Sequence, residues 1–342
     1  MREDDVIFRV DAGATRGLSF GHLFRCHEIS ETLKTQNGVG STFMMRDFAE
    51  GVRAARGLGV NVMTMPPDAQ PAMEAELLAG TPVRRIICDL PNAETVDIDS
   101  LRQAGKKVLV LDDFGNKTLS ADFVINGNLA KQHCQYEQPD GHCQKLYCGA
   151  DYCVIGQRFF DRRSQWVSPA VDKVLITFGG SDPTGITEKT VRALSGVSSL
   201  KTVTVLAGPG YQHNDRLHHV IKAASGPKFY LKENVPDIVS EFLEADVVIA
   251  AGGRTAYELA AMGKPAILIP SIDHEVSTAV ALEELGASVN LGPWGRSSAI
   301  RLSQVLRELN EKARRERMLK CGRAIFDGKA LNRVCAVIDG MA

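Results

Sequence analysis

Short, wholly apolar runs that alternate with helical segments are the feature of this 342-residue sequence that most restricts its fold. In the first half such runs extend from VIFRV (residues 6–10) to DFVIN (residues 122–126), with helical stretches such as GHLFRCHEISETLK between them. The second half repeats the pattern from KVLIT (residues 173–177) to PAILIP (residues 265–270). Strands that are apolar on both faces are typical of parallel sheets covered by helices on both sides. The sequence therefore predicts the α/β class, with two doubly wound, Rossmann-like domains.

The boundary between these domains is predicted in RFFDRRSQWVSPAVDK, residues 158–173, which is rich in charge and contains Pro169. We expect an N-terminal domain over residues 1–160 and a C-terminal domain over residues 170–342. The sequence after residue 301 is helical in pattern, and the tail of a two-domain α/β protein can cross back to the first domain.

Composition argues against several classes of function. The formal net charge is −1, so no charge excess favours bulk nucleic acid or an anionic membrane as a partner. The opening MREDDVIFRV carries acidic residues and lacks the apolar core of a secretory signal. The longest apolar runs fall far short of the roughly 20 residues that span a bilayer. We expect a cytoplasmic, monomeric protein that binds a small molecule.

Cysteine and histidine are concentrated between residues 133 and 153. The residues concerned are Cys134, Cys143, Cys148, Cys153, His133 and His142. These residue types bind zinc, but the spacing lacks the C-x-x-C pairs of structural zinc sites. Cys153 lies in an apolar YCVI segment, where a free thiol packs as a small hydrophobic group. We therefore expect reduced thiols and no metal.

Two glycine pairs follow predicted strands of the second half. Gly179-Gly180 stands in KVLITFGGSDPTG and Gly252-Gly253 in DVVIAAGGRTAYE. A turn without Cβ atoms lets backbone N–H groups approach a ligand, and the helix that follows favours an anion at its start. One such pair is more typical of a tight turn, whereas two in one domain favour phosphate binding for at least one. Neither matches GxGxxG or GxxxxGK[ST], so the sequence gives little support to NAD binding or to P-loop ATP binding. We expect no cofactor.

Glu258 lies five residues after Gly253, about one turn inside the predicted helix. A carboxylate at this position could accept hydrogen bonds from both hydroxyls of a ribose. It could equally serve only to complement the helix dipole. The spacing alone leaves both interpretations open.

Polar side chains also follow strands of the first half. They are Asp11, Asp89, Asp112, Asp113, Asn126 and Asn128. Each one alone is typical of a turn or a helix cap. Ligands of open parallel sheets bind beyond the carboxyl ends of the strands. The group together therefore predicts a polar pocket that suits a sugar better than an apolar ligand.

His22 follows Gly21 at the start of the first predicted helix, in SFGHLFRC. The N-terminus of a helix disfavours the charged imidazolium and so keeps the ring available as a base. Packing or capping is the more common role of a single histidine, and the residues around His22 must decide between the two.

The order of these segments resembles a family, the UDP-sugar hydrolases of pseudaminic acid biosynthesis (PseG) and the related spore-coat polysaccharide proteins (SpsG). The family's opening, roughly R-x-D-x-S-x-x-I-G-x-G-H-x-x-R-C, is similar to RVDAGATRGLSFGHLFRC here. The likeness continues in order through LVLDD, VINGN, LYCGADYCVIGQRF, VLITFGGSDPTGIT and VVIAAGGRTAYELAAMGKPAILI. The last two segments also resemble MurG-type glycosyltransferases, so the resemblance implies a GT-B architecture with a cleft between two domains.

What the resemblance implies is a metal-independent hydrolase of a UDP-linked modified amino sugar, of the UDP-2,4-diacetamido-2,4,6-trideoxy-altrose type. Water would attack the anomeric carbon with inversion and release UDP, in nonulosonic (pseudaminic) acid or surface polysaccharide biosynthesis. His22 would be the base, with UDP on the C-terminal domain and the sugar facing the N-terminal one. The substrate-binding residues implied are Asp11, Gly21, Arg25, Asp113, Asn126, Gly179, Gly180, Ser181, Gly252, Gly253, Thr255 and Glu258.

The sequence departs from the family pattern at two places. The loop before His22 is about two residues longer, and Ser19 replaces the first glycine of G-x-G-H. Asp273, His274 and Glu275 replace an Asn-Gln pair. Acidic charge beside a diphosphate is unfavourable unless His274 is protonated or these side chains point away.

Other functions remain open at this point. In a GT-B glycosyltransferase, His22 would deprotonate an acceptor hydroxyl instead of water. A nucleotide-sugar binding protein without catalysis is a further alternative, although the intact Gly21-His22-x-x-Arg25-Cys26 segment argues against it. A hydrolysing 2-epimerase is disfavoured because its carboxylate and arginine motifs are not evident.

Overall fold

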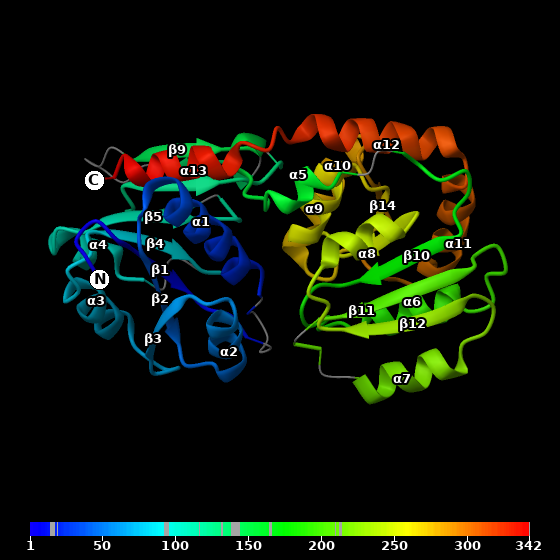
Figure 1. Ribbon diagram of the computed structural model, residues 1–342, viewed down its shortest axis with the longest axis horizontal. Coiled ribbons are helices and arrows are strands. Elements are labelled where there is room, and N and C mark those ends of the chain that lie inside the picture. Colours follow the sequence, from blue (N-terminus) through cyan, green and yellow to red (C-terminus); the bar gives the residue numbers. More distant parts are fainter. Residues whose placement is uncertain are drawn as a thin grey trace. The chain divides into compact units, whose positions relative to one another are not determined.

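The computed structural model describes residues 1–13, 18, 20–91, 96–115, 117–130, 133–137, 144–163, 166–208, 210–211 and 214–341. The chain forms two compact units, which are coloured along the sequence in Figure 1. Unit 1 comprises Met1–Ile155 and Lys329–Ala342, and unit 2 comprises Gly156–Gly328. None of the described helices has both the length and the apolar character needed to cross a bilayer.

Unit 1 is built on a parallel 7-stranded sheet in the order β3-β2-β1-β4-β5-β7-β9. Its strands are β1 (Val6–Val10), β2 (Ser41–Arg46), β3 (Asn61–Met65), β4 (Arg85–Asp89), β5 (Lys107–Leu111), β7 (Phe123–Asn126) and β9 (Lys145–Cys148). Its helices are α1 (Gly21–Asn37), α2 (Ala49–Gly57), α3 (Pro71–Ala79), α4 (Ile98–Gln103), the 3-10 turn η3 (Ala150–Tyr152) and α13 (Ala330–Asp339). Two short strands, β6 (Lys117–Thr118) and β8 (Tyr136–Glu137), pair separately.

Helices cover both faces of this sheet, as the alternation of side chains along β1 requires. Val6, Phe8 and Val10 point into a core that contains side chains of α1, α2 and α13. Ile7 points into the opposite core, which contains side chains of α3 and α4. This burial on both faces explains why most residues of the central strands are apolar.

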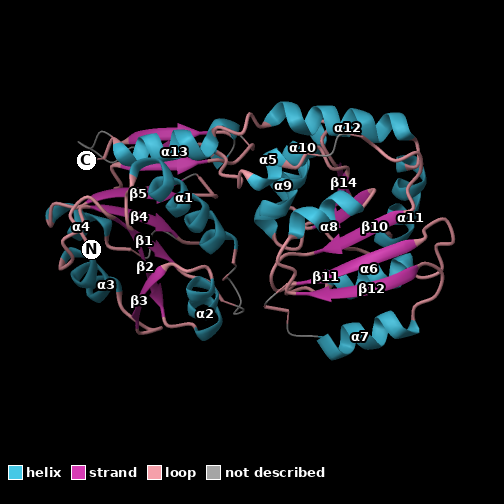
Figure 2. Ribbon diagram, viewed as in Figure 1, coloured by secondary structure: helices cyan, strands magenta, loops and turns pink. Residues whose placement is uncertain are grey.

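Unit 2 repeats the design on a parallel 6-stranded sheet in the order β12-β11-β10-β13-β14-β15. Its strands are β10 (Lys173–Thr177), β11 (Thr202–Ala207), β12 (Lys228–Glu233), β13 (Val247–Ala250), β14 (Ala266–Leu268) and β15 (Val289–Asn290). Its helices are α5 (Arg158–Asp161), α6 (Ile186–Leu194), α7 (Asn214–Ala223), α8 (Ile238–Glu244), α9 (Arg254–Met262), α10 (Asp273–Glu284), α11 (Ser298–Leu309) and α12 (Lys312–Ile325). Figure 2 shows strands flanked by helices in this unit as in unit 1. The prediction of two parallel α/β domains is confirmed.

The segment in which the boundary was predicted, residues 158–173, falls inside unit 2. The reason is local packing: the Phe159 ring in α5 lies 6.5 Å from the Phe242 ring in α8, between ring centroids, and α5 also contacts α9. The last helix, α13, belongs to unit 1, where Leu331, Val334 and Ile338 share a core with α1. Figure 1 shows α13 beside α1.

Both sheets have a point where the strand order reverses. In unit 1 the chain passes from β1 to β2 on one side, whereas β4 and β5 lie on the other side of β1. In unit 2 the corresponding neighbours are β10 and β13. Loops diverge at such a point and leave a crevice at the carboxyl ends of the two strands, where ligands of open α/β sheets bind. Candidate sites are therefore expected after β1 and β4, and after β10 and β13.

Candidate active site

His22 and Arg25 lie on one face of α1, close to its start. The helix begins at Gly21, and residues three positions apart in a helix are neighbours on its surface. The segment between β1 and α1 thus delivers both side chains to the carboxyl edge of the sheet. Within that segment Ala14–Gly17 and Ser19 lie outside the described residues, so the longer loop and the Ser19 departure stay sequence observations.

Two carboxylates come to the same edge from neighbouring strands. Asp89 is the last residue of β4, which pairs with β1 at Val10, and Asp113 follows the end of β5. Asp89 is fully buried, whereas about a third of the Asp113 side chain is exposed. The order β1-β4-β5 therefore places both acids next to the first turn of α1.

Short hydrogen bonds join these four residues, which we call the His22 cluster. His22 Nδ1 lies 2.7 Å from Asp89 Oδ1. Arg25 donates to Asp89 from Nε (2.8 Å) and Nη2 (2.6 Å), and to Asp113 from Nη1 (2.6 Å) and Nη2 (2.9 Å). The guanidinium thus contacts two carboxylates at once through paired hydrogen bonds, the arrangement for which arginine is best suited.

The charges of the His22 cluster support each other. Burial raises the pKa of Asp89, but the Arg25 guanidinium and the His22 ring outweigh it and hold that pKa well below its usual range. Burial likewise raises the pKa of Asp113, and Arg25 again lowers it on balance. Burial lowers the pKa of Arg25, yet Asp113 and Asp89 raise it well above its usual value. Arg25, Asp89 and Asp113 are therefore ionised and paired with one another at neutral pH.

In unit 2 the first glycine pair, Gly179-Gly180, forms a turn after β10. Gly179 has φ of 73°, a backbone region that suits glycine, and Gly210 N donates to Gly180 O at 2.8 Å. The start of α6 beyond this turn is already occupied by an anion of the protein. Asp182 accepts hydrogen bonds from the backbone N–H groups of Ile186 (2.9 Å) and Thr187 (2.8 Å).

The second pair, Gly252-Gly253, leads directly into α9, and here the situation differs. Gly253 is the N-cap of α9 and, as a glycine, contributes no side-chain cap to the helix start. Thr255 lies in the first turn, and Glu258 is buried one turn later, where it accepts a hydrogen bond from Arg254 Nε at 3.2 Å. An uncapped helix N-terminus behind a glycine turn has the features of an anion-binding site.

Comparison with known proteins identifies a similar domain, a similar full-length chain and a similar fold. Residues 174–330 match the glycosyltransferase family 28 C-terminal domain. The spore coat polysaccharide biosynthesis protein SpsG of Bacillus subtilis (strain 168) is 23% identical over 338 residues, which cover 97% of this chain and 96% of SpsG. The crystal structure of Acinetobacter baumannii MurG has a TM-score of 0.70 at 15% identity, covering 98% of this chain and 99% of MurG. The chain is SpsG/PseG-like and related to MurG.

The likeness to MurG shows the fold, so the SpsG-like chain has the GT-B fold, as predicted. A further relative is the UDP-N-acetylglucosamine–N-acetylmuramyl-(pentapeptide) pyrophosphoryl-undecaprenol N-acetylglucosamine transferase of Nitratidesulfovibrio vulgaris. It is 31% identical over 183 residues, which span 49% of this chain and 46% of that transferase. SpsG, by contrast, matches along almost the whole length of both chains.

The structure places Asp11 and Asn126 within hydrogen-bond networks of unit 1. Asp11 is buried, pairs with Arg9 and accepts a hydrogen bond from the backbone N–H of Arg46 at 2.8 Å. Asn126 is fully buried and donates to His133 O (2.7 Å) and to the Tyr136 hydroxyl (2.8 Å). In the SpsG-like chain these two side chains hold the loops at the strand ends. Their role in substrate binding stays a prediction.

Glu275 lies beside the second glycine pair. Its Oε2 accepts hydrogen bonds from Ser271 N and Ser271 Oγ, both at 2.7 Å, and a Cβ built on Gly253 would lie 3.1 Å from its Oε1. The carboxylate thus stays next to the glycine turn instead of pointing away. His274 is exposed, and the side chain of Asp273 lies outside the described part of the structure.

The cysteine-rich segment is described only in part, because Cys143 and His142 fall outside the described residues. Cys134 and Cys148 are hydrogen-bonded to each other, and burial raises the pKa of both thiols, that of Cys148 to about 12. Among the described residues no His, Cys, Asp and Glu side chains form a group of three that could hold a metal ion.

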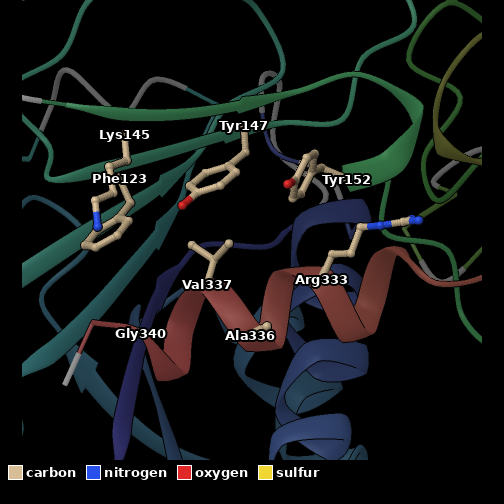
Figure 3. A pocket seen from close by; sticks show the side chains of 8 residues that line it. All are labelled: Phe123, Lys145, Tyr147, Tyr152, Arg333, Ala336, Val337 and Gly340. Atoms are coloured by element: carbon tan, nitrogen blue, oxygen red, sulfur yellow. The ribbon is translucent and has the colours of Figure 1, made fainter.

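Unit 1 also contains a pocket of about 290 Å³ between β7, β9 and α13 (Figure 3). It is lined by Phe123, Lys145, Tyr147, Tyr152, Arg333, Ala336, Val337 and Gly340. The Tyr147 and Tyr152 rings lie 5.2 Å apart between centroids, and Lys145 Nζ lies 5.3 Å from the centroid of the Phe123 ring. No residue of the His22 cluster lines this pocket.

The most informative residue that sequence reasoning left out of the predicted site is Asp89. It was recognised as an acid at a strand end, together with Asp11 and Asp112, and nothing in its local sequence distinguishes it from them. The signal lies in the strand order, because only β4 is adjacent to β1 on the side where α1 begins with His22.

Proposed function

We propose that this chain hydrolyses a UDP-linked modified amino sugar, of the UDP-2,4-diacetamido-2,4,6-trideoxy-altrose type, and releases UDP with inversion at the anomeric carbon. Its product would enter nonulosonic (pseudaminic) acid or surface polysaccharide biosynthesis. The full-length similarity to SpsG supports a role in polysaccharide biosynthesis. The transferase relative acts on UDP-N-acetylglucosamine, which supports a UDP-linked amino sugar as the substrate class.

The observation that carries the proposal is the hydrogen bonding of the His22 ring, in which one nitrogen is bonded to a carboxylate and the other is available to a ligand. Its side chain is 13% exposed, Nδ1 is bonded to Asp89, and no described residue is hydrogen-bonded to Nε2. A ring held in this way can bind a water molecule at Nε2 and take its proton as the water attacks. General-base catalysis of this kind contributes roughly 10²- to 10⁴-fold to a rate.

Unit 2 would bind the leaving group. We place the diphosphate at the glycine turn before α9, where backbone N–H groups and the helix dipole stabilise the charge that develops on UDP. Gly179, Gly180 and Ser181 would add backbone donors, and Glu258 would accept the ribose hydroxyls. We prefer the turn before α9 because Asp182 already accepts hydrogen bonds from the start of α6, whereas the Glu275 carboxylate beside Gly253 is hydrogen-bonded to Ser271. Glu275 must move away or be neutralised for a diphosphate to bind at this turn.

A glycosyltransferase of the same fold is the second candidate, in which His22 would deprotonate an acceptor hydroxyl. The match of residues 174–330 to a glycosyltransferase domain favours it. The two reactions share a base and a leaving group, so they differ only in what attacks the anomeric carbon.

The test is UDP release from UDP-2,4-diacetamido-2,4,6-trideoxy-β-L-altrose, with EDTA present and no acceptor. We expect the wild type to release UDP and His22→Ala to be at least about 100-fold slower, because the base is lost. UDP affinity should not change, since unit 2 carries the proposed nucleotide site. His218→Ala, which alters an exposed histidine of α7, is the matched control and should retain full activity.

Three outcomes would each overturn one part of the proposal, namely the reaction, the substrate or the base. UDP release that requires an added hydroxyl acceptor would support the transferase. Release from a different UDP-amino sugar alone would correct the substrate. Equal rates for His22→Ala and the wild type would remove His22 as the base.

A further inference from the structure

We propose that Asp89 is a positioning residue that fixes the proton of His22 on Nδ1, so that Nε2 presents its lone pair. The kinetic consequence of this inference rests on the proposed function, whereas the proton position does not.

The hydrogen bonds around Arg25 determine where the proton of His22 must be. Arg25 Nη2 lies 3.2 Å from His22 Nδ1, so a neutral ring could in principle accept a hydrogen bond there. Each terminal nitrogen of a guanidinium carries two hydrogens. Those of Nη2 are directed to Asp89 Oδ1 at 2.6 Å and to Asp113 Oδ2 at 2.9 Å. With both hydrogens used by charged acceptors, Nδ1 must be the donor in its 2.7 Å contact with Asp89 Oδ1.

Both carboxylate oxygens of Asp89 accept hydrogen bonds from neighbouring side chains. Oδ1 receives His22 and Arg25 Nη2, whereas Oδ2 receives Arg25 Nε at 2.8 Å and Cys26 Sγ at 3.5 Å. The side chain is fully buried, and Asp89 is the last residue of β4, a strand in the middle of the sheet. A buried, ionised carboxylate with no proton to give leaves the ring a single neutral tautomer.

An asparagine at position 89 would preserve the shape of the side chain but not these hydrogen bonds. If its oxygen faced His22, its amide N–H₂ would face the N–H of Arg25 Nε. If the amide were flipped, its N–H₂ would donate to His22 Nδ1 and move the ring proton to Nε2. The first orientation thus places two hydrogen-bond donors against each other. The second puts the ring proton on Nε2, so that Nε2 can no longer act as the base.

The chemical consequence concerns one proton. As the oxygen of water bonds to the anomeric carbon, the bond from that carbon to the UDP oxygen breaks and UDP takes the electron pair. The water proton passes to His22 Nε2, and the resulting imidazolium donates from Nδ1 to Asp89, which stabilises it. A carboxylate that orients a histidine base in this way contributes to kcat by keeping the ring in its reactive tautomer.

The first measurement is the tautomer itself, read from long-range ¹H–¹⁵N spectra of the full ¹⁵N-labelled chain. The signals of His22 are assigned by their loss in His22→Ala. We expect neutral wild-type His22 to carry its proton on Nδ1, with Nε2 unprotonated. A neutral ring protonated on Nε2 would overturn the inference, and this result requires no substrate and no Asp89 variant.

The variants Asp89→Asn and Asp113→Asn form a matched pair, because each removes one of the two carboxylates that pair with Arg25. Asp113 Oδ2 is 3.9 Å from His22 Nδ1, so Asp113→Asn should leave the tautomer unchanged. Asp89→Asn should move the proton to Nε2 in part or entirely. Identical tautomers in the two variants would contradict the role of Asp89.

Turnover then measures the kinetic effect. We expect Asp89→Asn to lower kcat by about 10²- to 10⁴-fold with little change in KM, since the base and not binding is affected. An unchanged kcat would refute the positioning role. If the wild type releases no UDP from any UDP-amino sugar, the proposed function fails while the tautomer still decides the inference.

Discussion

At the scale of single residues, Arg25 is the group on which the His22 cluster depends. Asp89 is fully buried, and a carboxylate in that position is ionised only if a cation compensates the lost hydration. Arg25 provides this compensation with two hydrogen bonds and uses two further donors for Asp113. The charge state of the cluster is thus set by one guanidinium and not by solvent.

This arrangement predicts how stability depends on pH. The folded-state pKa of Asp89 is depressed, so its ionised form stabilises the folded state above the unfolded pKa of about 3.9. As pH falls below about 4, the unfolded chain takes up the proton first, and the stabilisation is lost toward the folded-state pKa. The Tm difference between wild type and Asp89→Asn should be full at pH 6 and shrink between pH 4 and pH 2.5, as measured by thermal unfolding. A difference that stays constant over this range would contradict the depressed pKa.

The sequence named His22, Arg25 and Asp113 as site residues, but it could predict only one of the contacts within this cluster. His22 and Arg25 are three residues apart in a helical pattern, so their shared face follows from helix geometry alone. Their carboxylate partners do not follow, because Asp89 and Asp113 are 67 and 88 residues from the positions they contact. Those contacts depend on which strands are neighbours in the sheet, a property that no local pattern contains.

At the scale of elements, the two glycine turns of unit 2 look alike in sequence and differ in structure. The start of α6 is capped by Asp182, whereas the N-cap of α9 is a glycine, which contributes no side-chain cap. The Asp182 cap was not predictable, because it requires a non-glycine residue with φ of 42° in the turn before the helix. Strands and helices themselves were predicted well, since the buried parallel strands are mostly apolar and alternate with helical patterns.

The close packing of the second turn predicts the effect of a single methyl group. A Cβ on Gly252 would lie 2.3 Å from the backbone oxygen of Glu275, so Gly252→Ala forces the backbone of the turn or of α10 to move. Overpacking of this kind costs about 1–3 kcal/mol, which a urea unfolding curve measures.

Gly295→Ala is the control for this substitution. A Cβ on Gly295 meets no atom within 4 Å, so this variant should change the free energy of unfolding by no more than about 0.5 kcal/mol. Equal free energies of unfolding for the two variants would contradict this prediction, because they would show that the turn before α9 accommodates the methyl group without destabilisation.

At the scale of the whole molecule, unit 1 is assembled from two separate parts of the sequence. The helix α13 follows unit 2 in the chain but fills the core of unit 1, where Val334 and Ile338 are fully buried with Leu23 and Ile29 of α1. Gln36 at the end of α1 also donates to Asn332 of α13 at 3.0 Å. The integrity of the first unit therefore depends on residues late in the chain.

Substitution in α13 should thus weaken unit 1 selectively. Ile338→Ala removes buried side-chain volume and should cost about 2–5 kcal/mol. Hydrogen exchange should become faster in α1 and α13 and remain unchanged in β10 to β14. Ile300→Ala, at a position that is 73% exposed, should change neither region. Faster exchange confined to unit 2 would contradict the assignment of α13 to unit 1.

The order in which a ribosome produces the two units follows from the place of α13. All of unit 2, Gly156–Gly328, is made before the residues that complete the core of unit 1. The core of unit 1 therefore stays incomplete, with apolar side chains of α1 uncovered, while unit 2 is translated and can fold. Chaperones that bind exposed apolar helices would meet the first half of this protein for longer than the second.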